Sequence, residues 1–217
     1  VPNIEFIIYG LATFCLLTLF HIAEKKLSPL FLILHFLWSF SIAAIVYTIG
    51  YGFDPFIHQA AIKAIEELGR IYPTTIYYLG QYSLIIWLHT FIGGTIAVWD
   101  KLLVPVAAAI FIPLALNRSL PTNTNRTNSI ILGLLILPFS LFIVTTPQNL
   151  GYIFLFLTII WSRKINNRGD EILLCLLALA ALVCQPIAGI PALLLVFTIF
   201  IQKISSKNIT QILYALS

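Results

Sequence analysis

Residues 51–81 have the sequence YGFDPFIHQAAIKAIEELGRIYPTTIYYLGQ, and this stretch decides the fold because it is the only long polar interruption between apolar runs. Around it the chain is rich in apolar residues: 60% of all positions are hydrophobic, 9% are charged, and the mean hydropathy is +1.00. A chain of 217 residues with this composition has too little polar surface to cover a soluble globule. We therefore expect an all-α, polytopic membrane protein.

Seven apolar runs are candidates for membrane spans, since a span needs roughly 20 apolar residues. They cover residues 4–21, 28–50, 94–116, 129–146, 150–162, 172–185 and 190–202. The first run has neither a basic segment before it nor a cleavage site after it, so we interpret it as a span and not as a signal peptide. The expected fold is a bundle of about seven spanning helices that forms a single transmembrane domain over residues 1–217.

Two features of the chain ends predict that the sequence is a fragment of a longer polytopic protein. The chain contains no Met and begins with Val1 and Pro2. Residues 211–217 also resemble another helix that is cut off as it starts.

The orientation depends on whether residues 81–99 cross the membrane, because Lys and Arg near span ends mark the cytoplasmic side. If they cross, 3 of the 12 basic residues are cytoplasmic and 9 are outside. If they do not, 9 are cytoplasmic and 3 are outside, namely Lys63, Arg70 and Lys101. The second arrangement is favoured, so residues 82–92 are predicted to lie along the outer interface within an outer loop over residues 51–93. The net charge of +4 follows this membrane pattern and indicates no nucleic-acid partner.

Two further features are predicted to lie on the outer side. The sequence QPIAGIP at 185–191 breaks the run 172–202 into a hairpin. One continuous helix there would be roughly 46 Å long, which exceeds a hydrocarbon core of about 30 Å. The sequence TTPQN at 145–149 indicates a second tight turn. Both tips are expected to converge with the long outer loop.

Inside the outer loop, apolar residues fall at helical spacing over positions 55–68, which predicts an amphipathic helix on the membrane surface. Its predicted apolar positions are Ile57, Ala61, Ala64, Ile65 and Leu68. Asp54 stands at the predicted N-cap and Pro55 at the first helical position. Gly69 is expected to end the helix, and Glu66 is interpreted as a charge on its solvated face.

Asp54 and His58 lie four residues apart at the membrane edge, where ionisable residues are candidates for function. Two structural explanations stay open beside that one. Capping alone explains an Asp before a Pro, and packing at the interface explains the imidazole. The three cysteines show no metal-type spacing and are interpreted as small buried hydrophobic residues.

The order of these features resembles the amino-terminal module of the C-type (GT-C) integral-membrane glycosyltransferases. That superfamily includes oligosaccharyltransferases, protein O-mannosyltransferases and bacterial lipid A aminoarabinose transferases. The resemblance covers roughly residues 28–202 and rests on order and topology. Its elements are an outer loop opening with FDPFIH at 53–58, an amphipathic helix, PTTIYYLGQY at 73–82, and a span beginning with Asp100 and Lys101.

The resemblance implies an integral protein of a prokaryotic plasma (inner) membrane with its active face extracytoplasmic. It would move a sugar from a polyprenyl-phosphate donor to an acceptor that the sequence does not identify. Asp54, assisted by His58, is then the carboxylate that engages the acceptor. Lys101, tethered by Asp100, would face the lipid phosphate. The remaining candidate substrate-binding residues are Tyr78, Gln81, Gln148 and Asn149.

Two departures from the family pattern limit what the resemblance implies. The turn at 145–149 carries no acidic residue, although many relatives have one there. The chain also has no paired-acid metal motif, so no metal site or cofactor is predicted, although oligosaccharyltransferases typically depend on a metal ion.

The main alternative is a non-catalytic transporter or lipid-handling membrane protein. Such a protein is expected to carry charged residues or broken helices near the middle of the membrane, whereas the polar residues here collect at the outer rim. A catalytically inactive relative of the same fold also stays open.

Overall fold

The computed structural model describes residues 3–22, 28–46, 54–70, 76–119 and 140–216. Every regular element in these ranges is a helix, which confirms the all-α prediction. The elements are α1 (Asn3–Ile22), α2 (Ser28–Val46), α3 (Asp54–Leu68), the 3-10 helix η1 (Ile76–Tyr78), α4 (Leu79–Ile92), α5 (Ile96–Ser119), α7 (Ser140–Ile143), α8 (Pro147–Trp161), α9 (Arg168–Cys184) and α10 (Pro186–Leu216).

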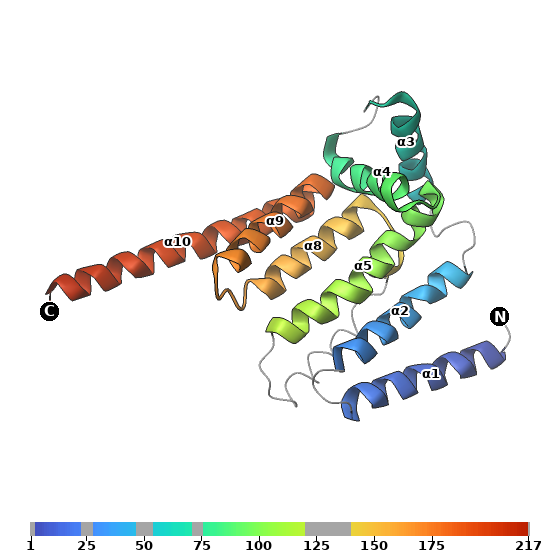
Figure 1. Cartoon of the computed structure of the whole chain (residues 1–217), viewed down its shortest axis with the longest axis horizontal. Helices are drawn as coiled ribbons and strands as arrows, with labels where there is room; N and C mark the ends of the chain where they lie inside the picture. Colours follow the sequence, from blue (N-terminus) through green and yellow to red (C-terminus); the bar gives the residue numbers. More distant parts are fainter. Residues whose placement is uncertain (1–2, 23–27, 47–53, 71–75, 120–139, 217) are drawn as a thin grey trace.

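The long helices form a row of neighbours in the order α1, α2, α5, α8 and α9, with α10 packed against both α9 and α8 (Figure 1). Helices α3 and α4 lie together across the ends of the long helices, on one side of the bundle (Figure 1). We call that end the α4 end. The opposite end, where α5 and α8 finish and α9 starts, is called the Arg118 end.

Helix α5 is the centre of the main core, because it contacts α2 on one side and α8 on the other. Val104, Ala108 and Ala109 of α5 are fully buried. They share one cluster with Phe36 of α2 and Ile153 of α8. Because α5 presents small alanines at this contact, the neighbouring helices can approach closely, as is common in membrane bundles.

By length and composition, two of the described helices could cross a membrane: Ile96–Ser119 and Pro186–Ile204. Shorter apolar helices cover Ile7–Phe20, Pro29–Phe40, Leu79–Ile92 and Pro147–Trp161. Most of the span expected at 129–146 lies outside the described residues, since the structure resumes at Ser140.

The predicted hairpin after α9 is present, but its break is shorter than expected. Gln185 alone separates α9 from α10: its N–H donates to the carbonyl of Ala181, and its own carbonyl accepts from the N–H groups of Ala188 and Gly189. The two helices run antiparallel against each other (Figure 1). Pro191 lies inside α10, so the prediction that it belongs to the break is wrong. Residues 211–216 continue α10, so the prediction of a further helix there is also wrong.

Helix α4 covers the segment 82–92 that was predicted to lie along the outer interface. Its 14 residues extend about 21 Å, less than the roughly 30 Å of a hydrocarbon core. It crosses the ends of α5, α8 and α9 (Figure 1). Both its length and its direction fit a segment that lies along a bundle end.

The amphipathic helix is confirmed as α3, but its buried face is only partly the predicted one: Ala61 and Ile65 pack against the cluster as expected. Ile62, which was not among the predicted apolar positions, is fully buried against Ile85 and Ile96. Ile57 and Leu68 are exposed instead. The reason is that α3 packs on α4 and α5, so its innermost positions are set by those helices and a second apolar strip is left outside.

Candidate functional site

Asp54 occupies the first turn of α3, with its side chain exposed. The helix includes Asp54 itself, so the predicted N-cap position is not where the structure places it. A carboxylate in the first turn still stabilises the helix dipole, typically by about 0.3–1 kcal/mol. The exposed Asp54 side chain lies on a helix that packs on α4 and α5, and not in an enclosed cavity between the 145–149 turn and the hairpin tip.

His58, one turn further along α3, is held by two tyrosines. Its Nδ1 lies 2.9 Å from the hydroxyl oxygen of Tyr82. The His58 ring also meets Tyr78 edge-on, with ring centroids 5.3 Å apart. The rings of Tyr78 and Tyr82 also meet edge-on, with their centroids 6.2 Å apart. These three rings form a cluster between α3 and α4, which we call the His58 cluster.

The His58 cluster favours a neutral imidazole beside a protonated phenol. Burial lowers the pKa of His58 below its usual value, and the nearby Asp54 carboxylate opposes that shift. Burial, with smaller contributions from Tyr78 and Asp100, raises the pKa of Tyr82 to about 12. When Nδ1–H donates to the Tyr82 oxygen, the Nε2 nitrogen keeps a lone pair. In that tautomer His58 can accept a proton from a substrate hydroxyl or amide.

Asp100 lies near the start of α5, with only 6% of its surface exposed. Its Oδ1 has no hydrogen-bond partner among the described residues. It is close enough to Tyr82 to affect that phenol, which places it on the side of α5 that faces α4. Lys101 follows it and is half-buried. The predicted tether between Asp100 and Lys101 stays a prediction.

Gln81 is completely buried, and neither its Oε1 nor its Nε2 has a partner in the described part of the chain. It follows Gly80, at which a Cβ would come within 2.9 Å of the Cys184 backbone nitrogen. The first turn of α4 is therefore pressed onto the last turn of α9. A buried amide without a hydrogen-bond partner lowers the free energy of unfolding by about 1–3 kcal/mol, so Gln81 at this position destabilises the fold.

The predicted break before α8 is confirmed, but it is shorter than 145–149, because Pro147, Gln148 and Asn149 already belong to α8. This break docks onto α5. Thr145 is buried, and its hydroxyl accepts a hydrogen bond from the Val104 N–H at 3.2 Å. Thr146 caps α8 by accepting from the Asn149 N–H. The Asn149 side-chain amide donates to the Val144 carbonyl at 2.9 Å, so it stabilises the turn. Gln148 is exposed and donates to the Tyr152 hydroxyl.

The candidate residues therefore divide into three groups. His58, Tyr78 and Asp100 gather around Tyr82, which the site prediction did not include. Gln81, Gln148 and Asn149 lie on α4 and α8 at the same end of the bundle, where these helices touch. Asp54 lies at the edge of this region, one helical turn from His58.

Sequence reasoning missed a clamp that fixes α3 to the turn between α4 and α5. Glu66, expected on a solvated face, lies 2.8 Å from His89 Nε2. His89 Nδ1 lies 2.5 Å from the Gly94 carbonyl oxygen. Both ring nitrogens thus face an acceptor oxygen, and this contact links α3 to α4 and to the turn that follows α4. No local pattern predicts a contact between residues 23 positions apart.

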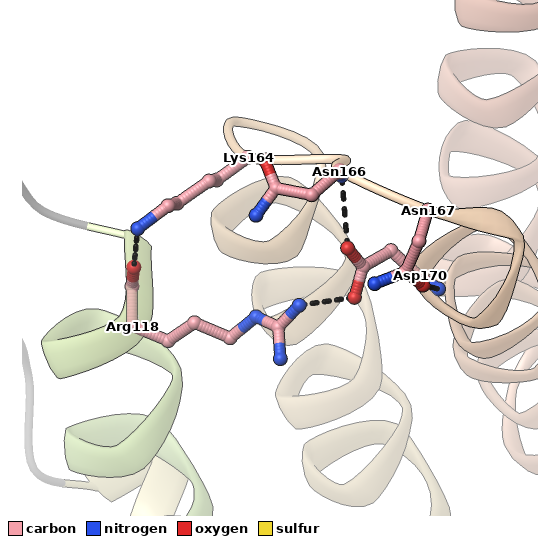
Figure 2. A network of polar contacts seen from close by, with 5 residues as sticks. All are labelled: Arg118, Lys164, Asn166, Asn167 and Asp170. Carbon is pink, nitrogen blue, oxygen red and sulfur yellow. Dashed lines mark hydrogen bonds and ion pairs between the residues drawn. The ribbon is translucent and has the colours of Figure 1, made fainter.

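The Arg118 end carries a separate network of charges, shown in Figure 2. Arg118 forms an ion pair with Asp170 and stacks over Trp161, with 4.2 Å to the ring centroid. The Asn166 N–H donates to the same carboxylate at 2.8 Å, and the Lys164 amine donates to the Arg118 carbonyl. The Asn166 N–H and then Arg118 lower the pKa of Asp170, against the effect of burial. This network ties the end of α5 to the start of α9.

The described residues contain no group of three or more His, Cys, Asp or Glu side chains placed to hold a metal ion. Comparisons with known proteins add no relative: no protein family, no curated protein and no solved structure matches the chain.

Proposed function

We propose that this chain is the membrane-embedded part of a glycosyltransferase that uses a polyprenyl-phosphate sugar donor at the extracytoplasmic face, in a bundle of about seven spans. The proposal joins the resemblance to the C-type integral-membrane enzymes with three features of the structure. They are an apolar exterior, a charge difference between the two bundle ends, and a polar site at the α4 end.

The exterior of the described helices supports a membrane setting. Large apolar side chains point outward along α1, α9 and α10, including Phe14, Leu176 and Phe197, which are 69%, 56% and 63% exposed. Soluble monomers rarely leave such extended apolar surface in water. A hydrocarbon solvent around the row of helices accounts for it.

The charges support the orientation in which the α4 end faces outward. Among the described side chains, the Arg118 end carries five basic residues: Arg118, Arg163, Lys164, Arg168 and Lys203. The α4 end carries Lys63, Arg70 and Lys101. Cytoplasmic ends of spans are enriched in Lys and Arg, so the α4 end is assigned to the extracytoplasmic side.

The observation that carries the functional proposal is the His58 cluster together with two buried polar residues near it, Gln81 of α4 and Asp100 of α5. A transferase of this class must place a proton acceptor and phosphate-binding groups where lipid meets water. His58 supplies a neutral imidazole there, and Asp54 lies one turn away with an accessible carboxylate. Lys101, on the first turns of α5, is assigned to the donor phosphate. Gln81 and Gln148 are assigned to the sugar or its acceptor.

The test is an Asp54→Asn substitution in the full-length protein. The assay measures release of polyprenyl phosphate from a polyprenyl-phosphate sugar in vesicles. We expect activity to fall on the order of a hundredfold with normal membrane expression, because Asn has nearly the same size but cannot ionise, and the lost helix-dipole stabilisation is only about 0.3–1 kcal/mol. Glu67→Gln, which removes an exposed carboxylate from the same helix, is the matched control and should leave activity unchanged. Full activity in Asp54→Asn would contradict the catalytic role of Asp54.

A second candidate function, transport or lipid handling, is favoured by one observation. His35 in α2 is 2% exposed, and neither ring nitrogen has a partner among the described residues. Ionisable residues inside spans often belong to substrate or proton pathways. If His35→Leu abolished transport in cells, and the unmodified protein released no detectable polyprenyl phosphate, the transport function would replace the transferase proposal.

A further inference from the structure

A groove between α9 and α10 at the Arg118 end has a composition unlike the rest of the exterior. Its volume is about 330 Å³, and it is lined by Arg168, Glu171, Ile172, Cys175, Leu176 and Phe200. Volumes of this size fit small organic ligands. It lies at the end of the molecule opposite the proposed catalytic site.

The groove has a charged mouth and an apolar track. Arg168, Ile172 and Leu176 are four residues apart in turn, so they share one face of α9. Leu176 lies about 12 Å further along the helix axis than Arg168. Ile172 and Leu176 are 61% and 56% exposed, and Phe200 of α10 forms the facing wall. A cation with an apolar strip leading away from it matches a phospholipid, whose phosphate is followed by acyl chains.

The charges around the mouth favour an anionic headgroup. The first turn of α9 contains two carboxylates, Asp170 and Glu171, but each already has a basic partner. Asp170 pairs with Arg118, and Glu171, the one acidic residue of the groove, pairs with Lys203. Among the described residues no carboxylate pairs with Arg168, so its positive charge is available to a ligand.

We propose that this groove binds one anionic phospholipid of the cytoplasmic leaflet, with the phosphate at Arg168 and an acyl chain along Ile172, Leu176 and Phe200. The inference rests on the proposed membrane embedding and orientation, and not on sugar transfer. The cytoplasmic leaflet is where anionic lipids attract basic side chains near span ends, by about 1 kcal/mol for each.

The experiment uses the full chain in nanodiscs that contain both phosphatidylglycerol and phosphatidylcholine, followed by native mass spectrometry of the released protein. We expect the unmodified protein to retain phosphatidylglycerol in preference to phosphatidylcholine. Arg168→Gln should reduce the retained phosphatidylglycerol about fivefold, which is the effect of losing one favourable charge. Arg168→Lys, which keeps the charge, should retain most of it.

Arg163→Gln is the matched control, because Arg163 is an exposed arginine at the same end but does not line the groove. An equal loss in Arg163→Gln would show a diffuse basic surface and overturn the site. Equal retention of phosphatidylglycerol and phosphatidylcholine by the unmodified protein would also overturn the site. If Arg168→Gln instead changed the oligomeric mass, the groove would be a contact between copies of the chain, and the lipid proposal would be wrong.

The two proposals fail in different ways. If Arg168→Gln lost the preference for phosphatidylglycerol while polyprenyl-phosphate release stayed intact, the result would support this site independently of the transferase. A protein without transfer activity that still retained phosphatidylglycerol through Arg168 would contradict only the catalytic proposal.

Discussion

Asp54 and His58 lie one helical turn apart, yet the structure places them in different surroundings. Asp54 is exposed, whereas His58 is held by Tyr82 and Tyr78. A side chain that contacts two aromatic neighbours has a fixed orientation, which suits a group that must meet a substrate proton at hydrogen-bond distance. Catalysis by this pair would therefore combine a positioned imidazole with an accessible carboxylate.

The pH dependence of α3 docking follows from the lowered pKa of His58. Its pKa in the folded protein lies below the unfolded value of 6.5, so the unfolded state binds more protons between the two values. Stability is therefore unaffected by this group above pH 6.5 and decreases as the pH falls through 6.5 towards the folded pKa. We expect the protection factors of the α3 amides, which are exchange rates corrected for the intrinsic pH dependence of amide exchange, to fall over that interval. In His58→Gln this pH dependence should be clearly reduced.

The control for this prediction is His89→Gln, because His89 is the other imidazole that contacts α3. Its loss should raise α3 exchange at neutral pH, since it removes the contact between His89 and Glu66. An unchanged pH dependence in His58→Gln would contradict the assigned role of His58.

At the scale of elements, the contact between α9 and α10 leaves no room for a side chain at Gly189. A Cβ at Gly189 would lie 2.0 Å from the Leu182 Cα, far inside van der Waals contact. Ala178, Ala181 and Ala192 are fully buried in the same contact. Small residues allow the one-residue break at Gln185 to turn the chain back on itself.

We expect Gly189→Ala to destabilise the protein by 1–3 kcal/mol or more, because the added methyl group forces the two backbones apart. The measurement is the thermal unfolding midpoint in detergent micelles. Gly10→Ala in α1 is the matched control, since a Cβ there meets nothing within 4 Å. That change should be neutral or stabilising by about 0.5–1 kcal/mol. Equal midpoints for the two variants would show that the α9–α10 contact is looser than described.

Local patterns predicted the helices well and their contacts poorly. Composition and periodicity identified α3, the break before α8 and the break after α9, because each depends on neighbouring residues. They did not predict that Ile62 is the buried residue of α3, since the answer lies in α4 and α5. Pro191 was misplaced because a proline beyond the first turn usually interrupts a helix, whereas α10 continues through it although the Ile187 carbonyl has no N–H donor at position 191.

The candidate site shows the same division. Asp54 and His58 could be found from their chemistry at a span boundary. Tyr82 and His89 could not, because their importance arises from contacts across 24 and 23 residues with α3. Gln81 was selected from a resemblance, and its complete burial without a partner depends on how closely α4 approaches α9.

At the scale of the whole molecule, the two ends differ in chemistry. The α4 end combines aromatic rings, an imidazole with a lowered pKa and buried amides. The Arg118 end is a network of paired charges (Figure 2) with an excess of basic residues. Helices α5 and α8 both run from the α4 end to the Arg118 end.

Cysteine labelling tests which end faces outward. In a background with the three native cysteines replaced by serine, Arg163→Cys should be protected from an impermeant thiol reagent in intact cells. Glu67→Cys should react, because both positions are exposed but lie at opposite ends of the bundle. Permeabilised cells provide the control, in which both should react. Labelling of Arg163→Cys in intact cells would reverse the orientation. It would then place the His58 cluster in the cytoplasm and Arg168 in the outer leaflet, where fewer anionic lipids are available. The topology therefore decides whether either proposed site faces the substrate assigned to it.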